Sequence, residues 1–191
     1  MLQLPVYMDN HATTRVDPRV VSEIVPLLDQ QYGNPGSTSH GFGWDAKDLV
    51  DAARDSIAQN IGCSHKEIIF TSGATESNNL ALRGVTHRAR RSGNEIISVR
   101  TEHKAILDPL DRLSRDGIKV NLLPVQQTAG VDAGLISPLQ IADAISDDTF
   151  LVSVMMANNE IGVIQPIAEI GKLCRERGVL FHTDATQAVG R

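Results

Sequence analysis

Cysteine is scarce in this 191-residue chain: Cys63 and Cys174 are its only two, and they lie far apart. Neither belongs to a CxxC pair or to a cysteine–histidine pattern with the spacing of metal ligands. The sequence therefore predicts neither a disulfide framework nor a metal site. A chain without disulfides suits a reducing compartment, so we expect a cytoplasmic location.

Long apolar runs and dense basic runs are also missing. The apolar stretches are far shorter than the roughly 20 residues that cross a bilayer, and no basic-then-apolar leader opens the chain. The formal net charge is -5 and the pI is about 5.6. Nucleic acids and anionic membranes attract concentrated Lys and Arg, so the sequence predicts no nucleic-acid partner and no membrane partner.

Internal repeats and low-complexity tracts are absent as well. Hydrophobic residues make up 41% of the chain and charged residues 21%, which is the composition of an ordinary globular protein. At this length one domain can bury a real core.

Short apolar runs alternate with amphipathic segments along the chain. The runs predict strands at 67–71, 95–99, 119–123 and 149–156, and a closing strand that begins at Val179 and delivers Asp184 from its carboxyl end. Helical spacing, with Pro or Gly at the ends, predicts helices at 18–28, 43–60, 106–115, 138–145 and 166–177. Strand–helix–strand units of this kind are right-handed and give a mainly parallel sheet covered on both faces. The predicted fold class is therefore α/β, a three-layer sandwich.

Two helices carry specific packing predictions. In the first, we expect the apolar residues Val21, Ile24, Val25 and Leu28 to face the core. In the last, Cys174 shares the apolar face, so we expect a buried packing residue and not a nucleophile.

Small residues follow the strand predicted at 67–71 and lead into a helical pattern. A strand, a small-residue turn and a helix start direct free backbone N–H groups at an anion, so Ala74 and Thr75 are candidates to hold a phosphate. Thr75 and Asn78 could equally cap the helix. This stretch alone leaves both interpretations open.

Polar residues also follow three other predicted strands, at His103, Asn158 and Asp184 with Gln187. A lone histidine or a polar turn is usually structural, but the carboxyl ends of parallel strands share one edge, where open α/β sheets build their sites. A carboxylate delivered by the closing strand suits a cofactor whose ring nitrogen must stay protonated, as in pyridoxal 5'-phosphate. No GxGxxG follows any strand, which argues against a dinucleotide. The cofactor prediction fails if Asp184 faces solvent or lies far from Thr75.

Five stretches of the chain resemble those of one enzyme family. They are residues 7–14, 70–78, 101–105, 157–162 and 182–187. In this order they resemble the cysteine desulfurases of the iron–sulfur-cluster assembly type, which belong to the class V aminotransferase group with the fold type I large domain of pyridoxal phosphate enzymes.

The resemblance implies a role for each candidate residue. Phosphate binding falls to Ala74 and Thr75, and ring stacking with help in proton transfer to His103. Contacts with the cofactor's substituents fall to Asn158 and Gln187, and protonation of the ring nitrogen to Asp184.

The resemblance also implies a reaction and partners. Members of the family remove sulfur from L-cysteine, giving L-alanine and an enzyme persulfide that passes to a sulfur acceptor or scaffold protein for iron–sulfur cluster or other sulfur transfer. They are homodimers.

The chain departs from the family in what it does not contain. The family's Schiff-base lysine and persulfide-forming cysteine lie beyond the Asp184–Gln187 stretch, and the chain ends at Arg191. We therefore expect residues 1–191 to form the cofactor-binding large domain with its N-terminal segment, without the small C-terminal domain and inactive alone. Two alternatives remain open: another class V enzyme, such as a selenocysteine lyase or an aminotransferase, and a non-catalytic cofactor-binding or assembly subunit.

Overall fold

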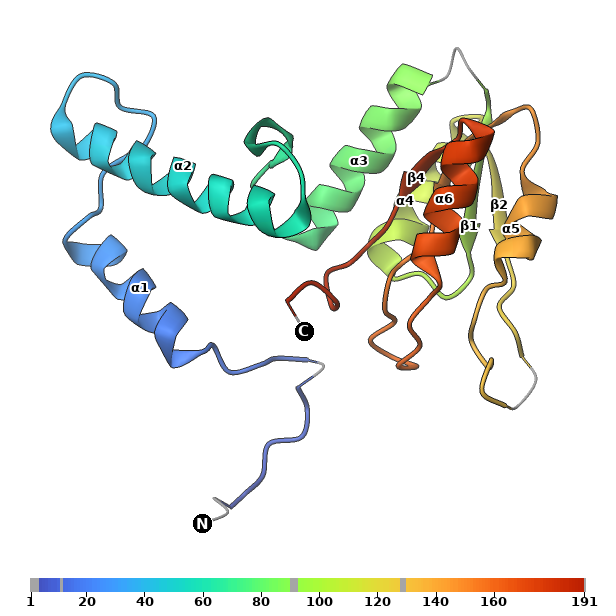
Figure 1. Cartoon of the computed structure of the whole chain (residues 1–191), viewed down its shortest axis with the longest axis horizontal. Helices are drawn as coiled ribbons and strands as arrows, with labels where there is room; N and C mark the ends of the chain where they lie inside the picture. The colour runs from blue at the N-terminus through green and yellow to red at the C-terminus, as the bar shows by residue number, and fades with distance from the viewer. Residues whose placement is uncertain (1–3, 11, 90–92, 128–129, 191) are drawn as a thin grey trace. The chain divides into compact units, whose positions relative to one another are not determined.

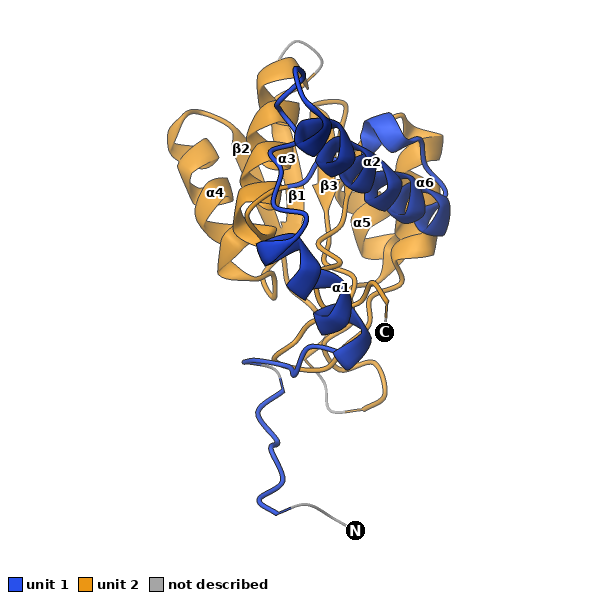
Figure 2. Ribbon diagram, turned by 90° about the vertical axis from the view of Figure 1, so that its left-hand side faces the viewer, with its two compact units in different colours: residues 1–70 blue, residues 71–191 orange. Residues whose placement is uncertain are grey.

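The computed structural model describes residues 4–10, 12–89, 93–127 and 130–190. The chain divides into two compact units, Met1–Phe70 and Thr71–Arg191 (Figure 2). The first contains α1 (Pro18–Asp29), α2 (Gly41–Ile61) and the short 3-10 helix η1 (His65–Glu67). The second contains α3 (Ala74–Ala89), β1 (Glu95–Val99), α4 (Lys104–Arg115), β2 (Lys119–Leu123), α5 (Pro138–Ala144), β3 (Thr149–Ser153), α6 (Ile167–Arg177) and β4 (Leu180–His182).

The first helix begins where the sequence predicts but does not bury the face that the sequence predicts. The carboxylate of Asp17 caps it by accepting from the N–H of Arg19 at 2.8 Å, with Pro18 at the first helical position. None of its residues is buried, and the four apolar residues expected to face the core are 44–74% exposed. That packing prediction is wrong, because an apolar stripe is buried only where another element covers it.

The prediction of a strand at 67–71 is also wrong. Ser64 and Glu67 form a capping box that begins η1, and the chain then continues without strand pairing. Ile69 and Phe70 are at least half exposed, and the Arg54 guanidinium lies 4.8 Å from the centre of the Phe70 ring. An apolar run becomes a strand only where a neighbouring strand supplies hydrogen bonds, and no described strand pairs with this one.

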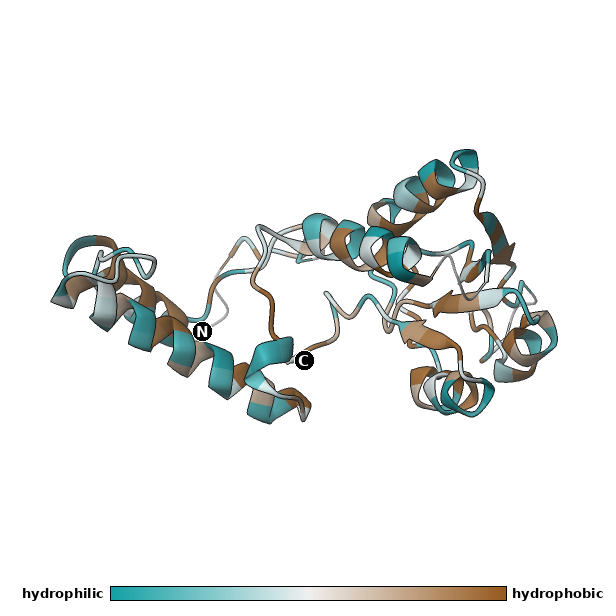
Figure 3. Cartoon of the chain, turned by 90° about the horizontal axis from the view of Figure 1, so that it is seen from above, coloured by the Kyte–Doolittle hydropathy of each residue, from teal (hydrophilic) through white to brown (hydrophobic). Residues whose placement is uncertain are grey.

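The second unit is built on a parallel four-stranded sheet in the order β2-β1-β3-β4 (Figure 1). Helices cover both of its faces, so the predicted three-layer α/β class is confirmed. In Figure 3 the strands are largely hydrophobic, whereas the helices carry both hydrophobic and hydrophilic residues. Among the described helices, none combines the length and apolar character needed to cross a bilayer.

Alternation along β1 divides the core into two clusters. Ile96 packs with residues of α3 and α4, including Leu82 and Leu110. Its neighbour Ile97 points to the other face and packs with residues of α5 and α6, among them Cys174. The thiol of Cys174 is fully buried, which raises its pKa to about 11, so the packing prediction is confirmed.

Candidate functional site

A cavity of about 190 Å³ lies at the carboxyl edge of the sheet in the second unit. Segments following β1, β3 and β4 meet there with the start of α3. Ten residues line it: Ala74, Thr75, His103, Ala105, Met155, Ala157, Asn159, Asp184, Thr186 and Gln187. Five of the six predicted site residues are among them, all except Asn158. Asp184 is only 8% exposed and shares the cavity with Thr75, so the stated condition for failure is not met.

The phosphate end of the predicted site is the first turn of α3, without a strand before it. The Glu76 carboxylate accepts from both the backbone N–H and the hydroxyl of Ser72 at 2.6 Å, which fixes the entry into the helix. The backbone N–H groups of Ala74 and Thr75 have no hydrogen-bond partner in the described part of the chain. With the positive end of the helix dipole, they form a place for an anion.

Asn78 does not cap α3 as one interpretation of the sequence had it. Its amide, 5% exposed, donates to Oδ2 of Asp184 at 2.8 Å across 106 residues of sequence. The sequence analysis missed this role. A signal was present, since Asn78, Leu82 and Thr86 recur every four residues and are the buried face of the helix.

Hydrogen bonds keep Asp184 ionised. Burial by itself raises the pKa of this carboxyl, but donation from Thr186 to Oδ1 at 3.0 Å, donation from Asn78 and the nearby His182 outweigh burial and lower it. A fixed carboxylate in a small cavity is suited to hold a positively charged ring nitrogen.

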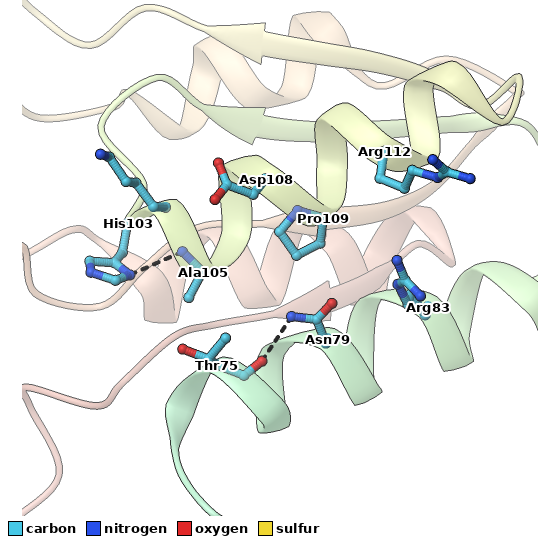
Figure 4. A pocket seen from close by; sticks show the side chains of 9 residues that line it. Thr75, Asn79, Arg83, His103, Ala105, Asp108, Pro109 and Arg112 are labelled. Carbon is cyan, nitrogen blue, oxygen red and sulfur yellow. Dashed lines mark hydrogen bonds between the residues drawn. The ribbon is translucent and has the colours of Figure 1, made fainter.

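His103 caps the N-terminus of α4. Its Nδ1 accepts from the backbone N–H of Ala105 at 3.0 Å, as Figure 4 shows. In the neutral ring the proton is therefore on Nε2, which leaves Nε2 as the nitrogen that can exchange a proton with a ligand.

Asn158 is engaged in the turn after β3. Its Nδ2 donates to the carbonyl of Thr101 at 2.7 Å, and its Oδ1 accepts from the N–H groups of Glu160 and Ile161. The next residue, Asn159, lines the cavity instead. The predicted contact of Asn158 with a cofactor stays a prediction.

Glu102 is a second buried carboxyl that the sequence analysis did not single out. It is 5% exposed, and its Oε1 accepts from the N–H of Met155 at 2.6 Å. Its Oε2 is buried without a hydrogen-bond partner among the described residues. Burial, together with the charge of Asp184, raises the pKa of Glu102 to about 8.

A more open cavity of about 370 Å³ adjoins the first and lies between α3 and α4 (Figure 4). The two share Thr75, His103 and Ala105. The outer cavity adds the cations Arg83, Lys104 and Arg112 and the acid Asp108, so it forms a polar, mainly cationic approach. Over the described residues no cluster of three or more His, Cys, Asp or Glu side chains could hold a metal ion.

Comparison with known proteins points to one family. The protein-family model described as "Aminotransferase class-V" matches residues 6–191. Cysteine desulfurase IscS of Rickettsia massiliae (strain Mtu5) is 50% identical over 190 residues, which cover 100% of this chain and 45% of that protein. The chain thus spans about half the length of the curated relatives it matches.

Solved structures agree with this assignment. A NifS-like protein superposes with a TM-score of 0.87 at 39% identity, covering 95% of this chain and 49% of that one. The structure of SspA in complex with cysteine gives 0.85 at 35% identity, covering 93% and 50%.

Proposed function

The chain belongs to the aminotransferase class-V family, and from this premise we propose that it forms the cofactor-binding part of a cysteine desulfurase. Class V aminotransferases and cysteine desulfurases are pyridoxal phosphate-dependent. The observation that carries the proposal is the cavity that holds an ionised, buried Asp184 together with the free N–H groups at the start of α3.

The residues present fit pyridoxal phosphate. The cofactor has a cationic ring nitrogen and an anionic phosphate, and the cavity has a carboxylate and a helix N-terminus to match them. Met155 and the small side chains of Ala105 and Ala157 complete the lining. Ala74 and Thr75 would hold the phosphate, Asp184 the ring nitrogen, His103 the ring face, and Gln187 and Asn158 the substituents.

When bound, the cofactor supplies an electron sink for the bonds broken at the substrate's Cα. The chain's own residues are arranged for this chemistry: Asp184 would hold the proton on the ring nitrogen, and His103 would present a proton on Nε2. We propose L-cysteine as the substrate and L-alanine with an enzyme persulfide as products. The relative SspA, solved in complex with cysteine, supports this choice of substrate.

The persulfide requires a thiolate that attacks the substrate sulfur. The new S–S bond forms as the substrate's Cβ–S bond breaks, and the electron pair of that bond stays with the carbon skeleton, which is protonated to give L-alanine. Cys174 cannot serve, because its thiol is fully buried with a pKa of about 11. Cys63 does not match the family's nucleophile in sequence. We therefore propose that the attacking thiol, like the lysine that anchors the cofactor, is supplied from outside these 191 residues, and that the active form is a homodimer that passes sulfur to an acceptor protein.

Cofactor binding by the chain itself is the first test. Titration with pyridoxal phosphate, followed by absorbance, should show reversible binding, and borohydride treatment should leave no lysine adduct in the mass spectrum. Asp184→Ala should retain the circular dichroism of the parent and bind at least about tenfold more weakly, because a charge-assisted hydrogen bond is lost. A covalent adduct on an internal lysine would overturn the proposal that the anchoring lysine comes from outside these 191 residues. Unaltered affinity for pyridoxal phosphate in Asp184→Ala would overturn the role of Asp184.

The activity has a separate test. Sequencing the coding DNA past Arg191 should find the family's Ser-Gly-His-Lys stretch in frame or in the next gene. The protein expressed with that segment and assayed with an added dithiol reductant should give alanine and sulfide from L-cysteine, because the reductant releases the outer persulfide sulfur as sulfide. Turnover of selenocysteine alone or transamination would identify another class V enzyme instead. Cofactor binding without turnover would identify a non-catalytic cofactor-binding or assembly subunit.

A further inference from the structure

Two buried glutamates lie at opposite ends of β1 and differ in the number of their hydrogen-bond partners. Glu95, at the start of the strand, is 1% exposed and fully partnered. Its Oε1 pairs with Nζ of Lys119 at 2.7 Å, and its Oε2 accepts from Ser146 and Thr149. Burial opposes ionisation, but these partners lower the pKa of Glu95, so it is a carboxylate at neutral pH.

Glu102, three residues beyond the end of β1, lacks such partners. One oxygen accepts a single backbone N–H, from Met155, and the other has no partner in the part of the chain that the structure describes. No described Lys, Arg or His lies within ion-pair distance of it. An isolated buried charge is very costly, so a side chain in this position keeps its proton instead.

The position of Glu102 connects it to the cavity. It directly precedes His103, the cap of α4, and it bonds to Met155, which lines the cavity. A second bond, from Asn158 to the carbonyl of Thr101, joins the same two segments. The turn that carries His103 is thus joined by two hydrogen bonds to the segment that follows β3.

Asp184 and Glu102 are two neighbouring carboxyls whose pKa values are shifted in opposite directions by their surroundings. Asp184 accepts two hydrogen bonds and is ionised, whereas Glu102 accepts one. Pairs with separated protonation states are a common source of acid–base assignments in enzyme sites.

We propose that Glu102 is a positioning residue: as a neutral carboxylic acid it holds the His103 turn against the segment that follows β3 and leaves Asp184 as the ionised member of the pair beside a bound cofactor. The cofactor part of this inference rests on the proposed function. The proton on Glu102 and its effect on His103 are properties of the chain alone.

The groups near Glu102 and Asp184, and those on the turn that joins them to α4, define how pH acts on the pair. Asp184 contributes the negative charge from the segment after β4, and His182 on β4 is neutral at pH 7 because burial lowers its pKa. The start of α4 contributes exposed His103 and Lys104, while α3 contributes the neutral amide of Asn78. Loss of the proton from Glu102 therefore adds a second negative charge near Asp184. Asp184 stays ionised, and the added charge repels pyridoxal phosphate, whose net charge is negative at this pH because of its phosphate group.

Carboxyl ¹³C NMR of the apo chain tests the proton directly. One glutamate should titrate with a pKa near 8, and its signal should be missing in Glu102→Gln. Glu95→Gln is the matched control, since it removes a buried glutamate at the other end of β1, and it should retain that signal. Titration of Glu102 in the ordinary range of about 4 to 5 would overturn the proposal.

The ring ¹⁵N shifts of His103 test positioning in the same samples. Glu102→Gln keeps an oxygen for the N–H of Met155 and should leave these shifts unchanged, whereas Glu102→Ala removes it and should move them. Shifts that are identical in the parent and in Glu102→Ala would overturn the positioning role.

The affinity for pyridoxal phosphate tests the coupling to a ligand. Between pH 7 and pH 9 the parent should lose about tenfold more affinity than Glu102→Gln, because only the parent gains the second charge. Comparing the two proteins cancels the titration of the cofactor itself, and Glu95→Gln should follow the parent. Equal pH dependence in the parent and Glu102→Gln would overturn the coupling. A parent that binds no cofactor at either pH would count against the proposed function, and the two NMR results would still decide the role of Glu102.

Discussion

At the scale of single residues, the neighbours of a carboxyl decide its charge in this chain. Asp184, Glu95 and Glu102 are all at most 8% exposed. Asp184 and Glu95 each have several donors and are ionised, whereas Glu102 has one donor and keeps its proton. Burial sets the cost of a charge, and the number of donors decides whether the charge is kept.

Removing the amide of Asn78 should therefore destabilise the second unit and raise the pKa of Asp184. We expect Asn78→Ala to lower the free energy of unfolding by about 1.5–3 kcal/mol, because a buried charge loses a hydrogen bond. Urea unfolding at pH 7 measures the loss. The neighbouring Asn79, whose amide donates only to the carbonyl of Thr75, is the control. A loss as large in Asn79→Ala would show that the bond to Asp184 is not the cause.

At the scale of elements, the helices of the second unit are held by the sheet that they cover. Leu110 on α4 is 1% exposed and packs with Ile96 of β1 and Leu82 of α3. The position of α4 in turn places its cap, His103, at the cavity. Packing on one face of the sheet thus supports one wall of the site.

Shortening the Leu110 side chain should destabilise the second unit. We expect Leu110→Ala to lower the free energy of unfolding by about 2–5 kcal/mol, the range for large-to-small changes in a core. Leu139 on α5 is 75% exposed, so Leu139→Ala should change it by less than about 0.5 kcal/mol. Thermal unfolding followed by circular dichroism compares the two, and similar losses would contradict the packing described for α4.

At the scale of the whole molecule, the charge pattern sets the response to acid. Glu95 and Asp184 have pKa values that are lower in the folded chain than in the unfolded chain. The stability that they contribute is present above the ordinary carboxyl pKa of about 4 and is lost as pH falls through the lower folded values.

The free energy of unfolding should therefore fall as the pH drops from 5 to 3. Glu95→Gln removes one of the two titrating carboxyls. At pH 7 this variant should have a lower free energy of unfolding than the parent, because the ion pair with Lys119 is lost. Between pH 5 and pH 3 its free energy of unfolding should fall by less than that of the parent. Urea unfolding at several pH values measures both effects. An acid dependence that is equally steep in the variant would contradict the role of Glu95.

The sequence predicted the elements of the second unit well, because its strands and helices have strong periodicity and clear ends. Gly178 illustrates this: it stops α6 with a positive φ of 69°, a conformation that glycine adopts without strain. The predictions for the first unit were poorer. The pattern on α1 shows which face is apolar, but it cannot say whether another element covers that face.

The identities and spacing of the residues were sufficient to determine the parallel α/β class, the family, and the meeting of Thr75, His103, Asp184 and Gln187, because strand ends in a parallel sheet share one edge. Only the tertiary structure showed that Asn78 donates a hydrogen bond to Asp184, that Asn158 forms hydrogen bonds within its own turn, and that Glu102 is buried near Asp184. Hydrogen bonds and protonation states depend on which groups from distant segments come within about 3 Å of one another, and a linear pattern does not contain those distances.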